Sequence, residues 1–89
     1  MDKSGTAKKR VQVEIYGDKY VVKGDADDKH ILQIADYVDI KMNMIAQRSP
    51  HLSAKQVAVL AALNIADELY RLQDDYDKML QILEEVKEG

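Results

Sequence analysis

One uninterrupted stretch, residues 53–87, constrains the fold of this chain more than any other feature. It contains neither glycine nor proline, so it predicts a single helix that extends roughly 50 Å at about 1.5 Å per residue. Average helices in globular proteins are only about three turns long. A chain of 89 residues that places so much of its length in one helix needs another surface to pack against.

The start of this helix is marked by local signals. Ser53 and Gln56 have the spacing of a capping box, and Leu52 before the cap can pack onto Val57 as a hydrophobic staple. The single proline of the chain, Pro50, lies just before these residues and separates the long helix from the preceding segment. The long helix is therefore predicted to begin at the Ser53 cap.

The two halves of the long helix differ in character. Residues 57–66 are apolar almost all round, which is typical of a segment buried on every side. From residue 69 onward, apolar residues recur at alternating steps of three and four, a heptad pattern that predicts a coiled coil. Apolar Leu80 and Ile82 flank this seam and favour an assembly of more than two helices. The predicted a and d positions are Leu69, Leu72, Tyr76, Met79, Leu83 and Val86.

Near the N-terminus, residues 11–23 alternate between apolar and polar, which predicts two strands joined by a tight turn. A two-residue turn at Gly17-Asp18 suits a primed hairpin, because glycine tolerates positive φ. A lone hairpin is barely stable in water, so its apolar face must pack on another element. The predicted register places two pairs on that face, Ile15 opposite Tyr20 and Val13 opposite Val22.

A shorter helix is predicted between the hairpin and Pro50, with Asp25 as its N-cap and with Gln47 near its end. Asp28 would then lie at the third helical position, where a negative charge favours the helix dipole. Several apolar residues lie outside the main stripe of this helix, so we expect it to contact more than the hairpin. The stripe itself consists of Ile31, Ile34, Ala35, Val38, Met42 and Ile45.

Composition narrows the class of protein. The chain has no cysteine and a net charge of −3, which argues against a disulfide framework and against a general nucleic-acid binder. No apolar run approaches the ~18 residues of a membrane helix, and no signal segment opens the chain. We therefore expect a cytoplasmic protein that does not use a membrane. Residues 1–10 are polar, with bases at 8–10, and are predicted to form a flexible arm.

The sequence contains no motif for catalysis or for a cofactor. It lacks a phosphate-binding glycine-rich loop, a zinc-protease motif and a paired-cysteine motif. His30 has Asp27 one turn earlier, but two candidate ligands without a third do not define a metal site. We therefore expect a protein that is not an enzyme and that holds no metal or cofactor.

Together, these features predict an α+β fold. A β-hairpin and a short helix form a small dimeric head over residues 11–66, and the long helix continues as a coiled coil over residues 67–89. One copy cannot cover its own apolar surface, so we expect an obligate homodimer whose tails can pair two dimers into a tetramer. The predicted interface residues are Val57, Leu60, Leu63, Ile65, Leu69, Leu72, Tyr76, Met79, Leu83 and Val86.

Three segments of the chain have a distinctive order of residues. They are VQVEIYGDKY at 11–20, ADYVDIKM at 35–42 and LAALNIADEL at 60–69. In these three segments the chain resembles ZapA, a family of bacterial division-ring proteins that associate with the tubulin-like FtsZ. The third segment is the most specific, because it leads directly into heptads after a capped helix start.

The resemblance implies a non-catalytic cytoplasmic protein located at the midcell division site. It implies dimers that join through their coils into antiparallel tetramers, with heads that bind FtsZ filaments at both ends. Such a tetramer cross-links or bundles the filaments and stabilises the Z-ring. The matching charged positions of the head are Asp18, Lys19, Lys41, Arg48 and Lys55, and relatives often carry a base where Asp18 stands.

Two other functions stay open from the sequence. One is a generic coiled-coil scaffold for a different partner. The other is a small dimeric nucleic-acid-binding protein that uses the bases at residues 8–10, although the acidic total charge argues against it. The tail is also short compared with longer ZapA-like proteins, which leaves the balance between dimer and tetramer open.

Overall fold

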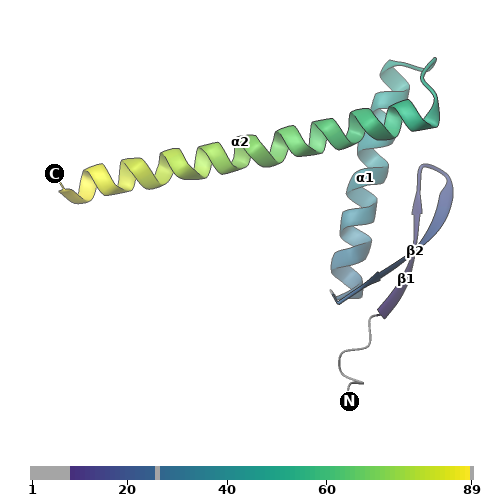
Figure 1. The fold of residues 1–89 in the computed structure, drawn as a ribbon, viewed down its shortest axis with the longest axis horizontal. Helices are drawn as coiled ribbons and strands as arrows, with labels where there is room; N and C mark the ends of the chain where they lie inside the picture. The colour runs from purple at the N-terminus through teal and green to yellow at the C-terminus, as the bar shows by residue number, and fades with distance from the viewer. Residues whose placement is uncertain (1–8, 26, 89) are drawn as a thin grey trace.

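The computed structural model describes residues 9–25 and 27–88 of the chain. The hairpin and the shorter helix form a head at one end of the long helix, and the rest of the long helix extends away from the head (Figure 1). This arrangement confirms the predicted α+β order with a long C-terminal helix. Its elements are β1 (Lys9–Ile15), β2 (Asp18–Gly24), α1 (Asp28–Arg48) and α2 (Ala54–Glu88).

The predicted flexible arm falls mostly outside the described residues. Residues 1–8 are not described, whereas Lys9 and Arg10 already belong to β1. The hairpin therefore begins two residues earlier than the sequence pattern indicated.

The predicted strand register is wrong by two residues. The structure pairs Val13 with Tyr20 and Ile15 with Asp18, so the turn consists of Tyr16 and Gly17 instead of Gly17 and Asp18. Because side chains alternate with a period of two, this shift leaves each residue on its predicted face. The apolar face is therefore confirmed, although the partners across it are not.

The observed turn has the backbone of a type I′ hairpin. Tyr16 has a φ of 52° and Gly17 a φ of 85°, and positive values at both central positions define this turn type. Glycine adopts such a conformation readily, but a bulky residue such as tyrosine rarely does. A tertiary contact stabilises it, because the backbone N–H of Tyr16 donates a hydrogen bond to Oδ1 of Asp39 on α1 at 2.7 Å.

α1 covers the β1 side of the apolar hairpin face. Val11 and Val13 are buried against Ile31 and Ala35 of α1, and Ile15 packs beside them. The β2 side of the same face is less covered, since the side chain of Tyr20 is 51% exposed. One helix is thus too narrow to shield both strands of the hairpin.

The predicted N-cap of α1 is wrong. The helix begins at Asp28, its N-cap is Asp27, and the side chain of Asp27 makes no capping hydrogen bond. Asp28 is therefore the first helical residue, not the third, and it still lies in the first turn where acidic side chains favour the helix dipole. The helix ends at Arg48, one residue after Gln47, which confirms the predicted end near Gln47.

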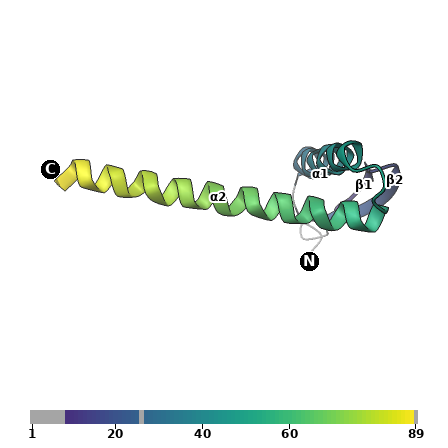
Figure 2. The same ribbon diagram turned by 90° about the horizontal axis from the view of Figure 1, so that it is seen from above.

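A second apolar cluster joins α1 to the start of α2. Met42 of α1 is buried against Val57 and Ala61, and Val57 has no exposed surface. Ile15 and Leu52 pack against the same cluster, so the hairpin and the loop before α2 both contribute to it. Seen from above, α1 lies on one side of α2 at this crossing (Figure 2).

The predicted capping box at the start of α2 is confirmed. The backbone N–H of Gln56 donates to Oγ of Ser53 at 3.1 Å, and the backbone N–H of Ser53 donates to Oε1 of Gln56 at 3.0 Å. Leu52 packs against the cluster that contains Val57, as expected of a hydrophobic staple. α2 is then continuous from Ala54 to Glu88, without a break between the predicted head and the predicted coil.

Candidate partner-binding and assembly surfaces

A hollow lies where the hairpin turn, α1 and the first turns of α2 meet. It brings together two of the charged residues predicted to bind a partner, Asp18 of β2 and Lys55 of α2. The Tyr16–Asp39 hydrogen bond fixes the hairpin turn beside this hollow. The residues that line it are Ile15, Tyr16, Asp18, Tyr20, Met42, Ala54, Lys55 and Ala58.

The lining of this hollow is mostly apolar, with one acidic and one basic side chain. Ala54 and Ala58 are small, so α2 contributes little bulk to it. Recognition sites on proteins commonly combine an apolar lining with a few polar groups that set orientation. The arrangement is suited to an apolar side chain of a partner that carries charges on either side.

The other predicted contact residues lie around the head. Lys19 follows Asp18 on β2, so alternation directs it to the opposite face of the hairpin, where it pairs across the strands with Glu14. Arg48 is exposed at the last position of α1. Asp18 and Lys55 therefore line the same hollow, whereas Lys19 does not.

Lys41 has a different environment, because it bonds within the chain. Its ammonium group forms an ion pair with the carboxylate of Glu68 on α2, and its side chain is only 20% exposed. The hydroxyl of Tyr37 donates to the other carboxylate oxygen of Glu68. The Lys41 ammonium also lies 5.2 Å from the centroid of the Tyr37 ring, within the range of a cation–π interaction.

This pairing perturbs both charged groups in the expected directions. The hydrogen bond to Glu68 raises the pKa of Lys41, and the hydrogen bonds from Lys41 and then Tyr37 lower the pKa of Glu68. Each partner favours the charged form of the other. Both groups are therefore fully charged at neutral pH.

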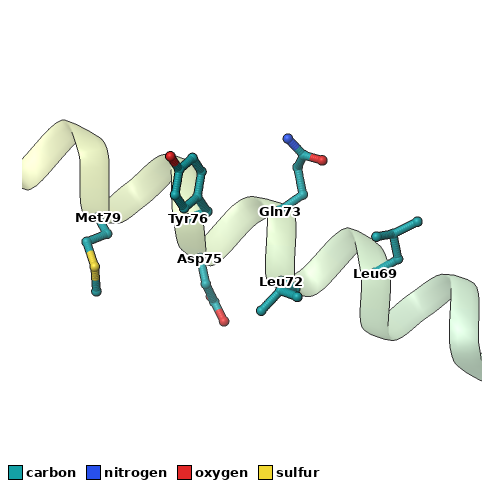
Figure 3. Close-up of a pocket in the computed structure, with 6 residues that line it drawn as sticks. All are labelled: Leu69, Leu72, Gln73, Asp75, Tyr76 and Met79. Atoms are coloured by element: carbon teal, nitrogen blue, oxygen red, sulfur yellow. The ribbon is translucent and has the colours of Figure 1, made fainter. Parts of the chain in front are cut away.

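The heptad seam on α2 is exposed along its whole length. Its six a and d side chains, from Leu69 to Val86, are between 57% and 72% exposed. In Figure 3, Leu69 and Tyr76 lie on one side of the helix axis and Leu72 and Met79 on the other. A contiguous exposed apolar stripe of this kind is a candidate interaction surface.

The half of α2 within the head has a second exposed apolar face. Val57 and Ala61 are buried toward α1, whereas Val59, Leu60 and Leu63 remain 53%, 40% and 60% exposed. One copy therefore covers only the α1-facing side of residues 57–66. Val57 was predicted as an interface residue, but in this conformation its side chain lies wholly inside the chain's own core.

Sequence reasoning did not identify Asp39, Tyr37 or Glu68 as important residues. Tyr37 and Asp39 lie on α1 outside its apolar stripe, and Glu68 is one of several acidic residues in the predicted coil. Each acts through a contact between segments that are 23 to 31 residues apart in the chain. No periodic pattern encodes such a pairing, so the sequence offered no signal for it.

Within residues 9–25 and 27–88, no three or more of the His, Asp and Glu side chains gather as a metal ion would require. In the same part of the chain, neither helix combines the length and the apolar character needed to cross a membrane.

Comparison with known proteins supports the resemblance seen in the sequence. The family model described as "Cell division protein ZapA" matches residues 11–88. Cell division protein ZapA of Geobacillus sp. (strain WCH70) is 40% identical over 81 residues, which cover 91% of this chain and 93% of the relative. The ZapA of Geobacillus kaustophilus (strain HTA426) is 37% identical over 86 residues, which cover 97% and 94%.

Solved structures agree with the fold. A ZapA mutant dimer from Geobacillus stearothermophilus has a TM-score of 0.71 and 33% identity, and the match covers 94% of this chain and 98% of that one. An unknown conserved bacterial protein from Pseudomonas aeruginosa PAO1 has a TM-score of 0.67 and 26% identity, with coverage of 90% and 98%. These matches extend over both the head and the long helix. The chain therefore belongs to the ZapA family of cell division proteins.

Proposed function

We propose that this protein binds FtsZ filaments through its head and cross-links them through its long helix. In this proposal two chains form a homodimer, and two dimers pair through an antiparallel coiled coil. The resulting tetramer carries heads at both ends and bundles filaments in the cytoplasm at the midcell division site, where it promotes assembly of the Z-ring. The protein acts as an adaptor and has no catalytic role.

The observation that carries this proposal is the exposed apolar seam on α2, in a chain that belongs to a cell division family. The seam lies beyond the head, and all six of its a and d side chains are more than half exposed. Burial of such side chains stabilises an assembly by roughly 1.5–3 kcal/mol for each one fully removed from water. The α2 helices of a second dimer carry the same heptad spacing, so they are the partner that we propose for this seam.

A separate surface supports self-association within the head. Val59 and Leu63 on α2 and Tyr20 on β2 are each more than half exposed, although they belong to the part of the chain that contains the core. A head built from residues 11–66 is in the size range in which an independent hydrophobic core is marginal. A second head that covers these side chains supplies the missing burial, and the related Geobacillus stearothermophilus protein was solved as a dimer.

The head surface proposed to contact FtsZ is the hollow that holds Asp18 and Lys55. It is formed by three elements, and the Tyr16–Asp39 hydrogen bond fixes its hairpin side. Lys19 on the opposite face of the hairpin and Arg48 at the end of α1 lie outside this hollow, and in this proposal they are secondary contacts.

Pelleting of FtsZ filaments tests both parts of the proposal. High-speed sedimentation collects single filaments and reports binding, whereas low-speed sedimentation collects only bundles and reports cross-linking. We expect the wild-type protein to co-sediment at high speed and to move FtsZ into the low-speed pellet. Absence of the protein from the high-speed pellet contradicts the proposed binding.

A charge reversal at the hollow refines this experiment. Lys55→Glu should reduce co-sedimentation at high speed, because it places a second acidic group beside Asp18. Lys29→Glu is a matched control, since Lys29 is an exposed residue of the same charge near the start of α1, outside the residues that line the hollow. Equal binding by the two variants rules out the hollow as the contact.

Analytical ultracentrifugation over a range of protein concentrations tests the assembly. The proposal requires a dimer at low concentration and a tetramer as concentration rises. A monomer at all concentrations contradicts it. Mobility shift with duplex DNA at moderate salt distinguishes the alternative of a nucleic-acid binder, for which retarded DNA is the expected result.

A further inference from the structure

The pair of helices is held together at two separate points. The first is apolar: Met42 packs on Val57 and Ala61, and partly buried Val38, Ile45 and Ala46 of α1 pack around them. The second is polar and consists of Tyr37 and Lys41 on α1, both bonded to Glu68 on α2. Glu68 lies seven residues beyond Ala61, so the polar contact is about 10 Å further along α2 at ~1.5 Å per residue.

Two contacts fix the direction of α2 more closely than one. The apolar cluster alone sets the angle between α1 and α2 only approximately, because helix packing prefers certain crossing angles with a scatter of about 15–20°. The Glu68 carboxylate binds one group with each of its two oxygens, Tyr37 at Oε1 and Lys41 at Oε2. Charge-assisted hydrogen bonds to both oxygens restrict the position and the orientation of this side chain.

The other ion pairs on α2 cannot have this effect. Asp67 pairs with Arg71 at 2.8 Å and Asp74 pairs with Lys78 at 3.0 Å, both with a spacing of four residues inside one helix. Such pairs support the helix locally but do not connect it to another element. Among the ion pairs of the described residues, the Lys41–Glu68 pair is the one that joins two elements.

We propose that Tyr37, Lys41 and Glu68 form a clamp that sets the direction in which α2 leaves the head. In this view Lys41 is a positioning residue and not a direct contact for the filament. The consequence for filament bundles rests on the proposed function, because a tetramer spaces filaments regularly only if its helices leave the heads in a fixed direction. The clamp itself is a property of the chain and can be measured without FtsZ.

Spin-label distances between α1 and the far part of α2 test the clamp directly. The chain has no cysteine, so Gln33→Cys and Gln81→Cys, both at exposed positions, supply the only two labelling sites. Labelled protein is mixed with an excess of unlabelled protein so that each assembly holds one labelled chain. Gln81 lies roughly 30 Å along α2 from the Ala61 crossing, so a rotation of about 10° there moves the label by about 5 Å.

Three substitutions remove parts of the clamp. Glu68→Gln keeps the shape of the side chain but removes the charge, Tyr37→Phe removes the hydroxyl, and Lys41→Met removes the ammonium group. We expect a single narrow distance distribution in the wild type and a broader or shifted one in each variant. Glu68→Gln combined with Lys41→Met should add little to either single change, because both remove the same contact.

The matched control is Asp67→Asn, which removes the same charge one residue earlier and breaks only the intrahelical pair with Arg71. Its distance distribution should equal that of the wild type. A distribution that stays unchanged in both Glu68→Gln and Tyr37→Phe overturns the clamp, since neither substitution alters the apolar cluster. A shift of equal size in Asp67→Asn also overturns it, because the effect would then follow from charge alone.

FtsZ pelleting separates positioning from direct contact. Glu68→Gln and Lys41→Met should both keep wild-type co-sedimentation at high speed, and electron micrographs should then show bundles with irregular filament spacing. Loss of high-speed co-sedimentation in Lys41→Met but not in Glu68→Gln overturns the assignment of Lys41 as a positioning residue. If the wild type itself fails to bind FtsZ, the proposed function is wrong, and the distance measurements still decide whether the clamp exists.

Discussion

The backbone N–H of Tyr16 donates a hydrogen bond of 2.7 Å to Oδ1 of Asp39, and this contact joins the hairpin turn to the middle of α1. It holds a tyrosine at a φ of 52°, a conformation that few residues other than glycine adopt without cost. The side-chain amide of Asn43 donates to the same carboxylate oxygen at 3.2 Å and restricts its position. The conformation of the turn is thus determined from outside the hairpin.

Removal of this carboxylate should destabilise the head. Asp39→Ala leaves the Tyr16 amide without its acceptor, and the loss of a hydrogen bond to a charged group lowers the free energy of unfolding by about 1.5–3 kcal/mol. Asp36→Ala is the control, because Asp36 is an exposed acid three residues earlier on the same helix. Urea denaturation at one fixed protein concentration compares the two, since dissociation makes stability depend on concentration. Equal midpoints for the two variants contradict the prediction.

The second turn position should also be sensitive to substitution. Gly17 has a φ of 85°, and an added Cβ meets no atom within 4 Å, so the effect of a side chain there is conformational and not steric. Gly17→Ala should lower the free energy of unfolding by about 1 kcal/mol. Gly17→Asn should cost less, because asparagine enters the left-handed region more easily. The reverse order of these two variants in a thermal melt disproves the explanation.

The capping box at the start of α2 should contribute to the free energy of unfolding. Ser53→Ala removes the acceptor for the backbone N–H of Gln56 and should lower the free energy of unfolding by about 1 kcal/mol. Ser53→Asp keeps an acceptor at this position and should retain most of the stability. Thermal melts followed by circular dichroism distinguish these results. If aspartate proves as destabilising as alanine, the cap is not the source of the effect.

Acidic substitutions in the heptad seam should disrupt the tetramer and leave the head dimer intact. Leu72→Glu with Met79→Glu places two carboxylates in the apolar seam, so we expect the head dimer to persist while tetramers and filament bundles disappear. Arg71→Gln with Lys78→Gln changes the net charge by the same two units at outward positions and should leave both assemblies intact. Ultracentrifugation and low-speed pelleting measure the two effects. Bundling retained by the seam variant excludes the coil as the cross-link.

The clamp between α1 and α2 should respond to acid. The hydrogen bonds from Lys41 and Tyr37 hold the pKa of Glu68 below its ordinary value of 4.5. A lowered pKa in the folded state means that the contribution is fully present above the ordinary pKa and is lost as pH falls through the lowered one. The raised pKa of Lys41 keeps its charge through the neutral and mildly alkaline range.

The difference in spin-label distance between the wild type and Glu68→Gln should therefore be constant around neutral pH and should vanish in acid. Measurements from neutral pH to well below about 4 follow this change. Asp67→Asn again serves as the control and should match the wild type throughout. A difference that persists after full protonation of the carboxyls contradicts an electrostatic clamp.

The local features of this fold could be read from the sequence alone. The faces of the hairpin depend on the alternation of side chains along a strand, and the α2 start depends on Ser53 and Gln56, which lie three residues apart. The heptad seam depends on spacing within one helix. Each of these relations is contained in a short segment, so the order of residues is enough to specify it.

Two features were decided only by tertiary structure. The sequence around Gly17 is compatible with two adjacent two-residue turns, and the hydrogen bond to Asp39 favours the turn centred on Tyr16 and Gly17. The sequence indicates only a surface charge at Lys41, whereas in the structure Lys41 pairs with Glu68, which lies 27 positions away.

The candidate binding surface was also predicted only in part from the sequence. Its charged members could be named from the sequence, but the meeting of Asp18 and Lys55 in one hollow required the packing of three elements. Periodic patterns determine which face of an element is apolar, because they follow from the geometry of one helix or strand. Contacts between distant segments depend on how these elements pack, and that packing is a property of the whole chain.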